Sequence, residues 1–288
     1  MKWRDGNGTR RPGIRLRSVM IALAIAAVAG WWFIDQPKRR GKAIAITKRA
    51  GGFVQFDDQY DPERPVSAPP PVSMVGLSDN WFGPEYAHGL SVVSLDGRRI
   101  TDDDLKNLER LESLQRLYLN GTPITDAGMV HLRGLSGLEV LELRETNIGD
   151  EGVRHLTRLP RLRALYLYET RVGDAGMAFL RGFQNLDELS LAHTAVGDAG
   201  LAHLANLKRL KILRLGGTRV TDAGVSHLNG FKKLEFLDLS QTGVTDAGLM
   251  HLSGLTDLRI LCVDRTSVTA AGRLALERAL PSIRIFSD

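Results

Sequence analysis

A repeat of 24 residues governs most of this chain and limits what it can fold into. Ile283 opens a shortened last copy, after a one-residue insertion near Ala279. A fixed period in this range is typical of stacked-repeat proteins, in which each unit buries its apolar face against its neighbours. We therefore predict one repeat domain over residues 90–288, with eight 24-residue repeats and a partial ninth. The leucines that open the eight full repeats are Leu90, Leu114, Leu138, Leu162, Leu186, Leu210, Leu234 and Leu258.

Each repeat divides into a strand and a short helix. In residues 114–137, Leu117 and Leu119 alternate as the inward side of a strand. Asp126 then occupies the position expected for a helix N-cap, and Gly134 the position expected for a left-handed C-cap. Parallel strands joined through helices cross over in the right-handed sense. The predicted fold class is therefore α/β, a right-handed solenoid with parallel strands on the concave face and short helices on the convex face.

Three further residue types recur at equivalent positions of successive repeats, and we call each such set a column. Thr122 recurs at the turn after each later strand, where its hydroxyl can bond freed backbone groups. Gly128 recurs at the helix start, and close approach of a neighbouring segment is one reason for a glycine there. Five histidines share one helix position, but neighbouring helices lie ~8–10 Å apart, whereas two nitrogens on one zinc ion lie ~3.4 Å apart. We predict helix-surface packing and no metal site for the five: His131, His155, His203, His227 and His251.

The repeat resembles the leucine-rich repeat family. Residues 114–132 follow the pattern L-x-x-L-x-L-x-x-T-x-[IV]-T-D-A-G-[LM]-x-H-L, which is similar to the family's variant with T-D-x-G-L after the strand. Some eukaryotic F-box substrate receptors carry a similar unit with cysteine in place of the threonine. Large membrane-anchored paralogues of planctomycete bacteria are similar in the repeat and in the N-terminal apolar segment. The resemblance covers residues 90–286 strongly and 15–57 loosely; it implies a bacterial repeat protein and leaves the partner open.

The net charge of +5 does not belong to the repeats. Residues 90–288 hold 25 Lys and Arg against 25 Asp and Glu, whereas residues 1–49 hold 12 against 2. A solenoid without net positive charge lacks the electrostatic attraction on which binding to phosphate backbones depends. We predict no nucleic-acid partner. Cys262 is the only cysteine, so the chain has no internal disulfide.

Residues 18–34 are apolar, without a charged side chain, and long enough for a short membrane span. We predict an N-terminal transmembrane helix that stays attached, because the apolar run continues through Ile34. The alternative is a secreted protein cleaved after Ala29, since Ala27-Val28-Ala29 matches a signal-peptide cleavage pattern. Six basic residues flank each side, but the short basic tail in front favours an N-terminus inside and repeats outside the cytoplasm.

The remaining segments complete the predicted domain organisation. Five prolines in residues 61–73 are typical of an extended linker. Aromatic residues just before the first repeat indicate a cap, because the end of a solenoid otherwise exposes its core. The predicted segments ahead of the repeats are a basic tail at 1–17, the transmembrane anchor at 18–34, a juxtamembrane helix and short strand at 35–60, the linker at 61–73 and the N-terminal cap at 74–89.

A candidate binding site lies on the predicted concave face. Side chains alternate along a strand, so the residues beside Leu117 and Leu119 point out of that face. Tyrosine and arginine are frequent among binding hot spots. Tyrosine also has a high propensity for strands, which is an alternative reason for its presence. All three tyrosines of the repeats fall in this set. The predicted protein-binding residues are Arg116, Tyr118, Glu142, Arg144, Tyr166 and Tyr168, with Arg214, Phe236 and Asp238 as a sparser later surface.

The predicted function is a membrane-anchored binding module for a protein or peptide. We predict no enzyme activity and no cofactor, because the sequence contains no P-loop, H-E-x-x-H, G-x-S-x-G or C-x-x-C motif. One alternative is an architectural envelope protein that packs against related copies. Another, by analogy with F-box receptors, is a substrate-receptor-like adaptor, although no F-box-like segment precedes the repeats. The oligomeric state is left open.

Overall fold

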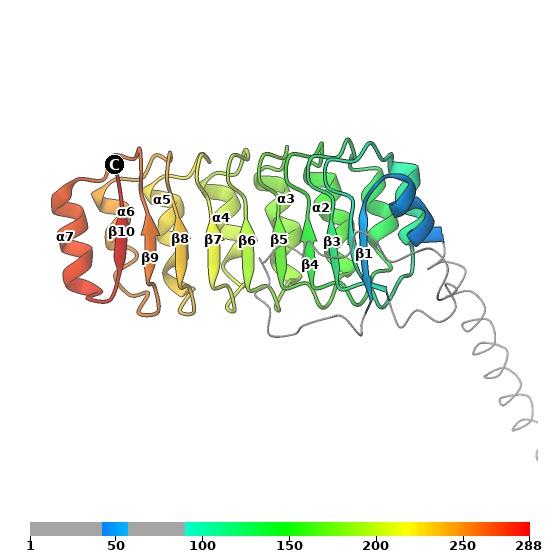
Figure 1. Ribbon diagram of the computed structural model, residues 1–288. Coiled ribbons are helices and arrows are strands. Elements are labelled where there is room, and N and C mark those ends of the chain that lie inside the picture. The colour runs from blue at the N-terminus through cyan, green and yellow to red at the C-terminus, as the bar shows by residue number, and fades with distance from the viewer. Residues whose placement is uncertain (1–41, 57–89) are drawn as a thin grey trace, which may run out of the picture.

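The computed structural model describes residues 42–56 and 90–288, and in them ten strands form one sheet in sequence order (Figure 1). β1 pairs antiparallel with β2, and every later neighbouring pair is parallel. The strands are β1 (Phe53–Phe56), β2 (Leu90–Ser94), β3 (Arg116–Tyr118), β4 (Val140–Glu142), β5 (Ala164–Tyr166), β6 (Glu188–Ser190), β7 (Ile212–Arg214), β8 (Phe236–Asp238), β9 (Ile260–Cys262) and β10 (Arg284–Phe286).

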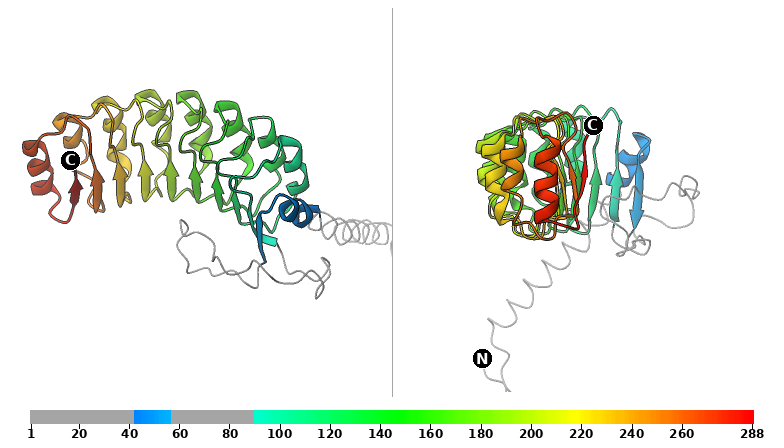
Figure 2. Two further views of the ribbon diagram at one scale, coloured as in Figure 1. Left: turned by 45° about the horizontal axis from the view of Figure 1, so that its top comes forward. Right: turned by 90° about the vertical axis from the view of Figure 1, so that its left-hand side faces the viewer.

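Short helices connect the parallel strands. Figure 2 shows an arc with the strands along its inner side and the helices along its outer side, as the sequence predicts. The α-helices are α2 (Asp150–His155), α3 (Asp174–Phe179), α4 (Asp198–Leu204), α5 (Asp222–Val225), α6 (Asp246–Met250) and α7 (Ala270–Ala279). The 3-10 helices are η3 (Asp102–Leu108), η4 (Gly128–Leu132), η5 (Leu156–Arg158), η6 (Leu180–Gly182) and η7 (Ser226–Gly230).

The core is a continuous ladder of leucines between the strands and the helices. Leu117 pairs in register with Leu141, Leu141 with Leu165, and Leu165 with Leu189, and all four side chains are fully buried. Each repeat stacks its leucines on those of the next repeat, so the apolar face of one unit is covered by its neighbours.

The aspartate column has a different role from the one predicted. Asp174 is the first residue of α3, and the N-cap position belongs to Gly173. The Asp174 carboxylate instead accepts hydrogen bonds from the backbone N–H groups of Gly197 (2.7 Å) and Gly200 (3.0 Å) in the next repeat. The predicted cap within the repeat is therefore wrong, because this side chain crosses to the following unit. The same bond to the residue 23 positions later is made by Asp102, Asp126, Asp150, Asp198, Asp222 and Asp246.

This carboxylate also explains the glycine column. A Cβ added at Gly200 would lie 2.5 Å from the Asp174 carboxylate, and one added at Gly152 would lie 2.5 Å from that of Asp126. Close approach by the preceding repeat, which the sequence suggested as one reason for the glycine, is confirmed. Glycine and aspartate therefore act as a pair across each repeat boundary.

The left-handed residue that recurs from repeat to repeat lies after the strand; within the repeats, Arg110 after η3 is the one described residue with a positive φ after a helix. Among the described residues, positive-φ glycines occur only at Gly51, Gly97, Gly121 and Gly217, so the predicted left-handed C-cap at Gly134 is wrong. The 3-10 helix η4 ends at Arg133, a residue in the right-handed helical conformation. No glycine is needed at such a helix end. The same turn position carries a positive φ in the other repeats, at Glu145, Glu169, His193, Gln241 and Arg265.

The threonine column closes this turn. The Thr122 hydroxyl donates to the Leu119 carbonyl oxygen at 2.6 Å, and the Thr146 hydroxyl does the same to Leu143 at 2.6 Å. Thr170, Thr194, Thr218, Thr242 and Thr266 repeat the contact three residues back. The structural role predicted for this column is confirmed.

Residues 42–56 close the N-terminal end of the sheet. Residues 42–49 are helical and bury Ala43 and Ile46 against the core, while β1 covers the free edge of β2. Gly52 is packed so tightly that an added Cβ would lie 2.3 Å from the Ser94 carbonyl oxygen. The predicted cap at 74–89, the span at 18–34, the basic tail at 1–17 and the linker at 61–73 lie outside the described residues. Within the described ranges, no helix is sufficiently long and apolar to cross a membrane.

Candidate functional site: the concave face of the sheet

The strand register brings the predicted site residues together. Tyr118, Glu142 and Tyr166 occupy one row across β3, β4 and β5, and Arg116 lies in the neighbouring row with Val140 and Ala164. Glu142 therefore lies between the two tyrosines.

Most of these side chains are not accessible. Arg116, Tyr118, Glu142 and Tyr166 are each less than 10% exposed, although they belong to the concave side of their strands. Arg144 keeps 39% of its side-chain surface. Tyr168 is half-exposed. Of the six predicted residues, Arg144 and Tyr168 thus offer the surface that a partner could touch.

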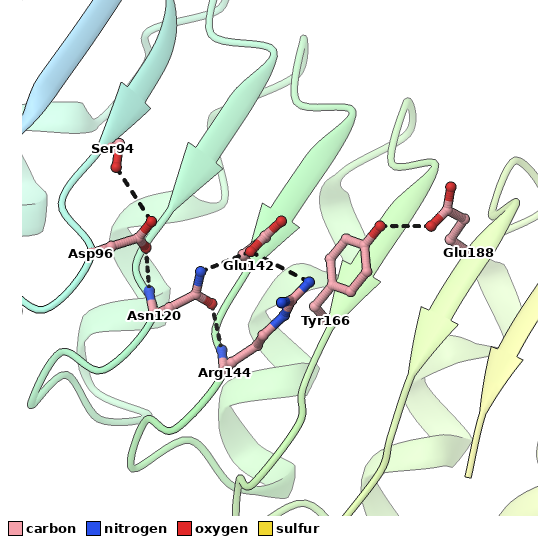
Figure 3. A network of polar contacts seen from close by, with 7 residues as sticks. All are labelled: Ser94, Asp96, Asn120, Glu142, Arg144, Tyr166 and Glu188. Atoms are coloured by element: carbon pink, nitrogen blue, oxygen red, sulfur yellow. Dashed lines mark hydrogen bonds and ion pairs between the residues drawn. The ribbon is translucent and has the colours of Figure 1, made fainter. Parts of the chain in front are cut away.

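Two of these buried side chains, Glu142 and Tyr166, belong to a polar network (Figure 3). The Asn120 backbone N–H donates to Asp96 (2.8 Å), and the Asn120 amide nitrogen donates to the Glu142 carboxylate (2.7 Å). The Arg144 backbone N–H donates to the Asn120 amide oxygen (2.9 Å), and its guanidinium lies 3.6 Å from Glu142. The side chains at this end of the face are therefore engaged with one another.

The same network continues to Tyr166. The Arg144 guanidinium carbon lies 4.6 Å from the centre of the Tyr166 ring, a cation–π contact. The Tyr166 hydroxyl donates to the Glu188 carboxylate at 2.6 Å, and burial together with this bond raises the pKa of Tyr166. Tyr166 is thus held from both sides and contributes to the structure of the sheet.

Two carboxyl groups in the network are costly to ionise. Burial raises the pKa of Asp96 above its ordinary value of 3.8, against the opposing hydrogen bonds from Asn120 and Ser94. Burial likewise raises the pKa of Glu142 above its ordinary value of 4.5, and the negative charges of Asp96 and Glu188 add to the effect. Arg144 and Asn120 offset part of this cost.

We expect Glu142→Gln to become more favourable relative to the native protein as the pH rises from 4 towards 7. A raised pKa means that the folded state retains a proton which the unfolded chain loses above its ordinary value of 4.5. The stability linked to this proton is complete below that value and is lost as the pH rises through the raised pKa. Thermal melts followed by circular dichroism should therefore show a difference in Tm that shifts in favour of the glutamine variant. A difference that stays constant with pH contradicts this expectation, and Glu112→Gln at an exposed position is the control.

The exposed part of the concave face lies in the later repeats. The outward residues of β3 to β6 are buried, whereas those of β7, β8 and β9 are half-exposed. At the position where the earlier repeats carry Arg144 and Tyr168, β6, β7 and β8 are followed by Ala192, Gly216 and Ser240. These small side chains do not cover the outward residues of the strand that follows each of them. The run of small residues was the signal in the sequence for the larger open surface. We call the exposed set the β7–β9 surface: Ile212, Arg214, Phe236, Asp238, Ile260 and Cys262.

Arg214 is the unusual residue of the β7–β9 surface. Its guanidinium carbon lies 5.1 Å from the centre of the Phe236 ring. One of its terminal nitrogens, Nη1, is buried and has no hydrogen-bond partner. An unsatisfied buried donor costs free energy. Arg214 as a whole is half-exposed, so the rest of its guanidinium faces the concave side.

The histidine column makes contacts between repeats. His131 Nδ1 lies 2.6 Å from the Glu109 carboxylate of the preceding repeat. His155 and His203 contact Arg133 and Arg181, again in the preceding repeat. These contacts agree with the helix-surface packing predicted for the column. In residues 42–56 and 90–288, no group of three or more His, Cys, Asp or Glu side chains is placed to hold a metal ion.

Comparison with known proteins decides the family. The family model described as "Leucine Rich repeat" matches residues 137–157 and 232–253, each of which spans the strand, turn and helix described above. The repeats of this chain are leucine-rich repeats. No curated protein matches the sequence.

Two solved structures resemble the leucine-rich repeat domain. Internalin C2 from Listeria monocytogenes superimposes with a TM-score of 0.57 at 23% identity, over 69% of this chain and 81% of that one. The plant peptide hormone receptor RGFR1, solved in complex with RGF2, gives a TM-score of 0.46 at 16% identity, over 70% of this chain and 35% of that one. At this level of identity the likeness to internalin C2 establishes the fold.

Proposed function

We propose that this leucine-rich repeat protein is a binding module for a protein or peptide and that it performs no catalysis. The observation that carries the proposal is the β7–β9 surface, which combines half-exposed apolar and charged side chains on the inner side of the arc. Stacked-repeat proteins use such extended concave surfaces to bind partners. Aromatic and arginine side chains are enriched among the residues that dominate binding energy, and Phe236 and Arg214 supply both.

This proposal moves the predicted contact surface along the sheet. Tyr118 and Tyr166 are buried, and the Tyr166 hydroxyl is bonded to Glu188, so the two tyrosines offer a partner little area. Phe236 and Ile260 pair in neighbouring positions of β8 and β9, and both are half-exposed. We place the centre of the site there, with Arg144 and Tyr168 towards its edge.

Affinity capture with the full chain, followed by measured affinities of variants, tests the proposal. We expect Phe236→Ala to weaken binding of the captured partner by more than ~1 kcal/mol, about fivefold, because a central aromatic side chain is removed. Tyr168→Ala should have a smaller effect. Leu274→Ala is the control, because Leu274 is 54% exposed on α7, away from the concave face.

The outcomes separate the candidate functions. A larger loss from Tyr168→Ala than from Phe236→Ala places the site in the earlier repeats and contradicts our location. Equal binding by all variants contradicts the use of the concave face. Recovery of only further copies of this chain supports the architectural alternative.

We further propose that residues 18–34 anchor the protein in a membrane, with the repeats outside the cytoplasm. The support is the uncharged apolar run, which continues past the cleavage pattern ending at Ala29. Mass spectrometry of the mature protein tests retention of the segment, and a mature chain that begins at Gly30 contradicts the anchor. Protease accessibility of the repeats in intact cells tests the orientation, and protection from added protease contradicts it.

A further inference from the structure

We propose that Arg214 recognises a carboxylate of the bound segment, and that the partner therefore presents a carboxylate next to an apolar side chain. This inference rests on the proposed binding function and specifies its ligand chemistry. The carboxylate can come from the C-terminus of a peptide or from an Asp or Glu side chain. The geometry on the inner face of β7 and β8 carries the argument.

Arg214 is held in place but lacks an anionic partner. It pairs in register with Ser190 on β6 and Asp238 on β8, and its guanidinium lies over the Phe236 ring. Its Nη1 atom is shielded from solvent without a hydrogen-bond acceptor. The site thus contains an oriented donor whose desolvation is not compensated within the described part of the chain.

The acidic side chains on the neighbouring strands accept hydrogen bonds from other residues. The Asp238 carboxylate accepts from the Ser240 backbone N–H at 2.9 Å, and the Glu188 carboxylate accepts from the Tyr166 hydroxyl at 2.6 Å. Burial, together with the nearby Asp238 and Asp264 charges, raises the pKa of Cys262 to about 11, so its thiol is neutral at pH 7. Among residues 42–56 and 90–288, none of these groups forms an ion pair with Arg214.

The other stacked arginine of this face shows the contrast. Arg144 lies over the Tyr166 ring much as Arg214 lies over Phe236. Arg144, however, has the Glu142 carboxylate at 3.6 Å and retains 39% of its side-chain surface. The two arginines share a stacking arrangement and differ in having an internal carboxylate. A ligand carboxylate is the acceptor that would complete the Arg214 site in the same way.

The surroundings specify the rest of the ligand. Ile212 lies two residues before Arg214 on the same side of β7, and Ile260 follows Phe236 in register on β9. All three apolar residues are half-exposed. An apolar side chain beside the carboxylate would cover them, which adds apolar burial to the charged hydrogen bond. We therefore infer a segment such as a terminal Phe or Leu, or an apolar residue followed by Glu.

Matched small probes test this chemistry on the full chain in lipid nanodiscs, with isotope-labelled isoleucine methyl groups observed by NMR. N-acetyl-phenylalanine carries a terminal carboxylate, and N-acetyl-phenylalanyl-glutamic acid amide carries a side-chain carboxylate. N-acetyl-phenylalaninamide and N-acetyl-phenylalanyl-glutamine amide are their uncharged counterparts. We expect a carboxylate probe to shift the Ile212 and Ile260 signals with a Kd at least tenfold lower than its counterpart. The probe pair that shows this preference identifies the source of the carboxylate.

Variants connect the preference to Arg214. Arg214→Gln should abolish it, Arg214→Lys should retain part of it, and Arg278→Gln, at an exposed position on α7, should leave it intact. An unchanged signal from the buried Ile124 methyl in each variant confirms that the fold is retained. Equal affinity of acid and amide, absence of any shift at 50 mM probe, or a preference that survives Arg214→Gln overturns the proposal. Loss of partner binding in Phe236→Ala without carboxylate selectivity would leave the binding function standing and remove only this inference.

Discussion

Leu189→Ala is expected to lower the free energy of unfolding by about 2–5 kcal/mol, the largest effect we predict for a single substitution. Leu189 is fully buried in the middle of the array, where it pairs in register with Leu165 and Leu213. Truncation removes apolar contacts on both sides and leaves a cavity that two neighbouring strands restrain from collapsing. Urea denaturation followed by circular dichroism measures the loss.

The position within the array supplies the control for Leu189→Ala. Leu274→Ala removes the same atoms from a side chain that is 54% exposed in the last repeat, and should cost less than about 0.5 kcal/mol. Equal losses at the two positions would mean that the leucine ladder does not carry the stability of the array.

The second large effect is expected at the repeat boundary. Gly200→Ala should destabilise the protein by about 1–3 kcal/mol, because the added methyl group would lie 2.5 Å from the Asp174 carboxylate and 3.0 Å from Val196. The methyl group forces apart two repeats that the carboxylate joins through Gly197 and Gly200. Thermal or urea melts of the variant measure the effect.

Gly182→Ala is the matched control for this substitution. Nothing lies within 4 Å of a Cβ added at Gly182, so alanine there should be neutral or slightly stabilising. Asp174→Ala removes the other member of the pair and leaves two N–H groups without their charged acceptor, which should cost about 1.5–3 kcal/mol. Were Gly200→Ala as harmless as Gly182→Ala, the close packing between glycine and aspartate would be disproved.

The periodic part of the fold was predictable from the sequence because every repeat carries the same pattern of residues. Leu117, Leu119 and Thr122 recur at fixed spacing, and each has one environment that repeats along the array. Asp126 was misassigned because an aspartate before a helix satisfies the requirements of a local cap equally well. Only the three-dimensional stacking shows that its carboxylate reaches Gly149 in the next repeat.

The binding face was less predictable because exposure depends on neighbours in space. Alternation along the strands correctly put Tyr118, Glu142 and Tyr166 in one row. It could not show that Arg144 would lie over Tyr166, or that Glu188 would accept its hydroxyl. The sequence offered no reason to single out Arg214, because the absence of an internal acceptor for its Nη1 atom depends on the folded arrangement of the strands.

The aspartate contacts that cross from each repeat to the next have a consequence for how such a gene can change. Each of the seven aspartates accepts a backbone hydrogen bond from the residue 23 positions later, and Asp174 also accepts one from Gly200, 26 positions later. Duplication or loss of any 24 consecutive codons inside the array, wherever the breakpoint falls, restores each donor and acceptor to the same offset. Unequal recombination can therefore lengthen or shorten the arc by whole units without breaking a boundary, whereas an insertion of any other length interrupts the series at one place.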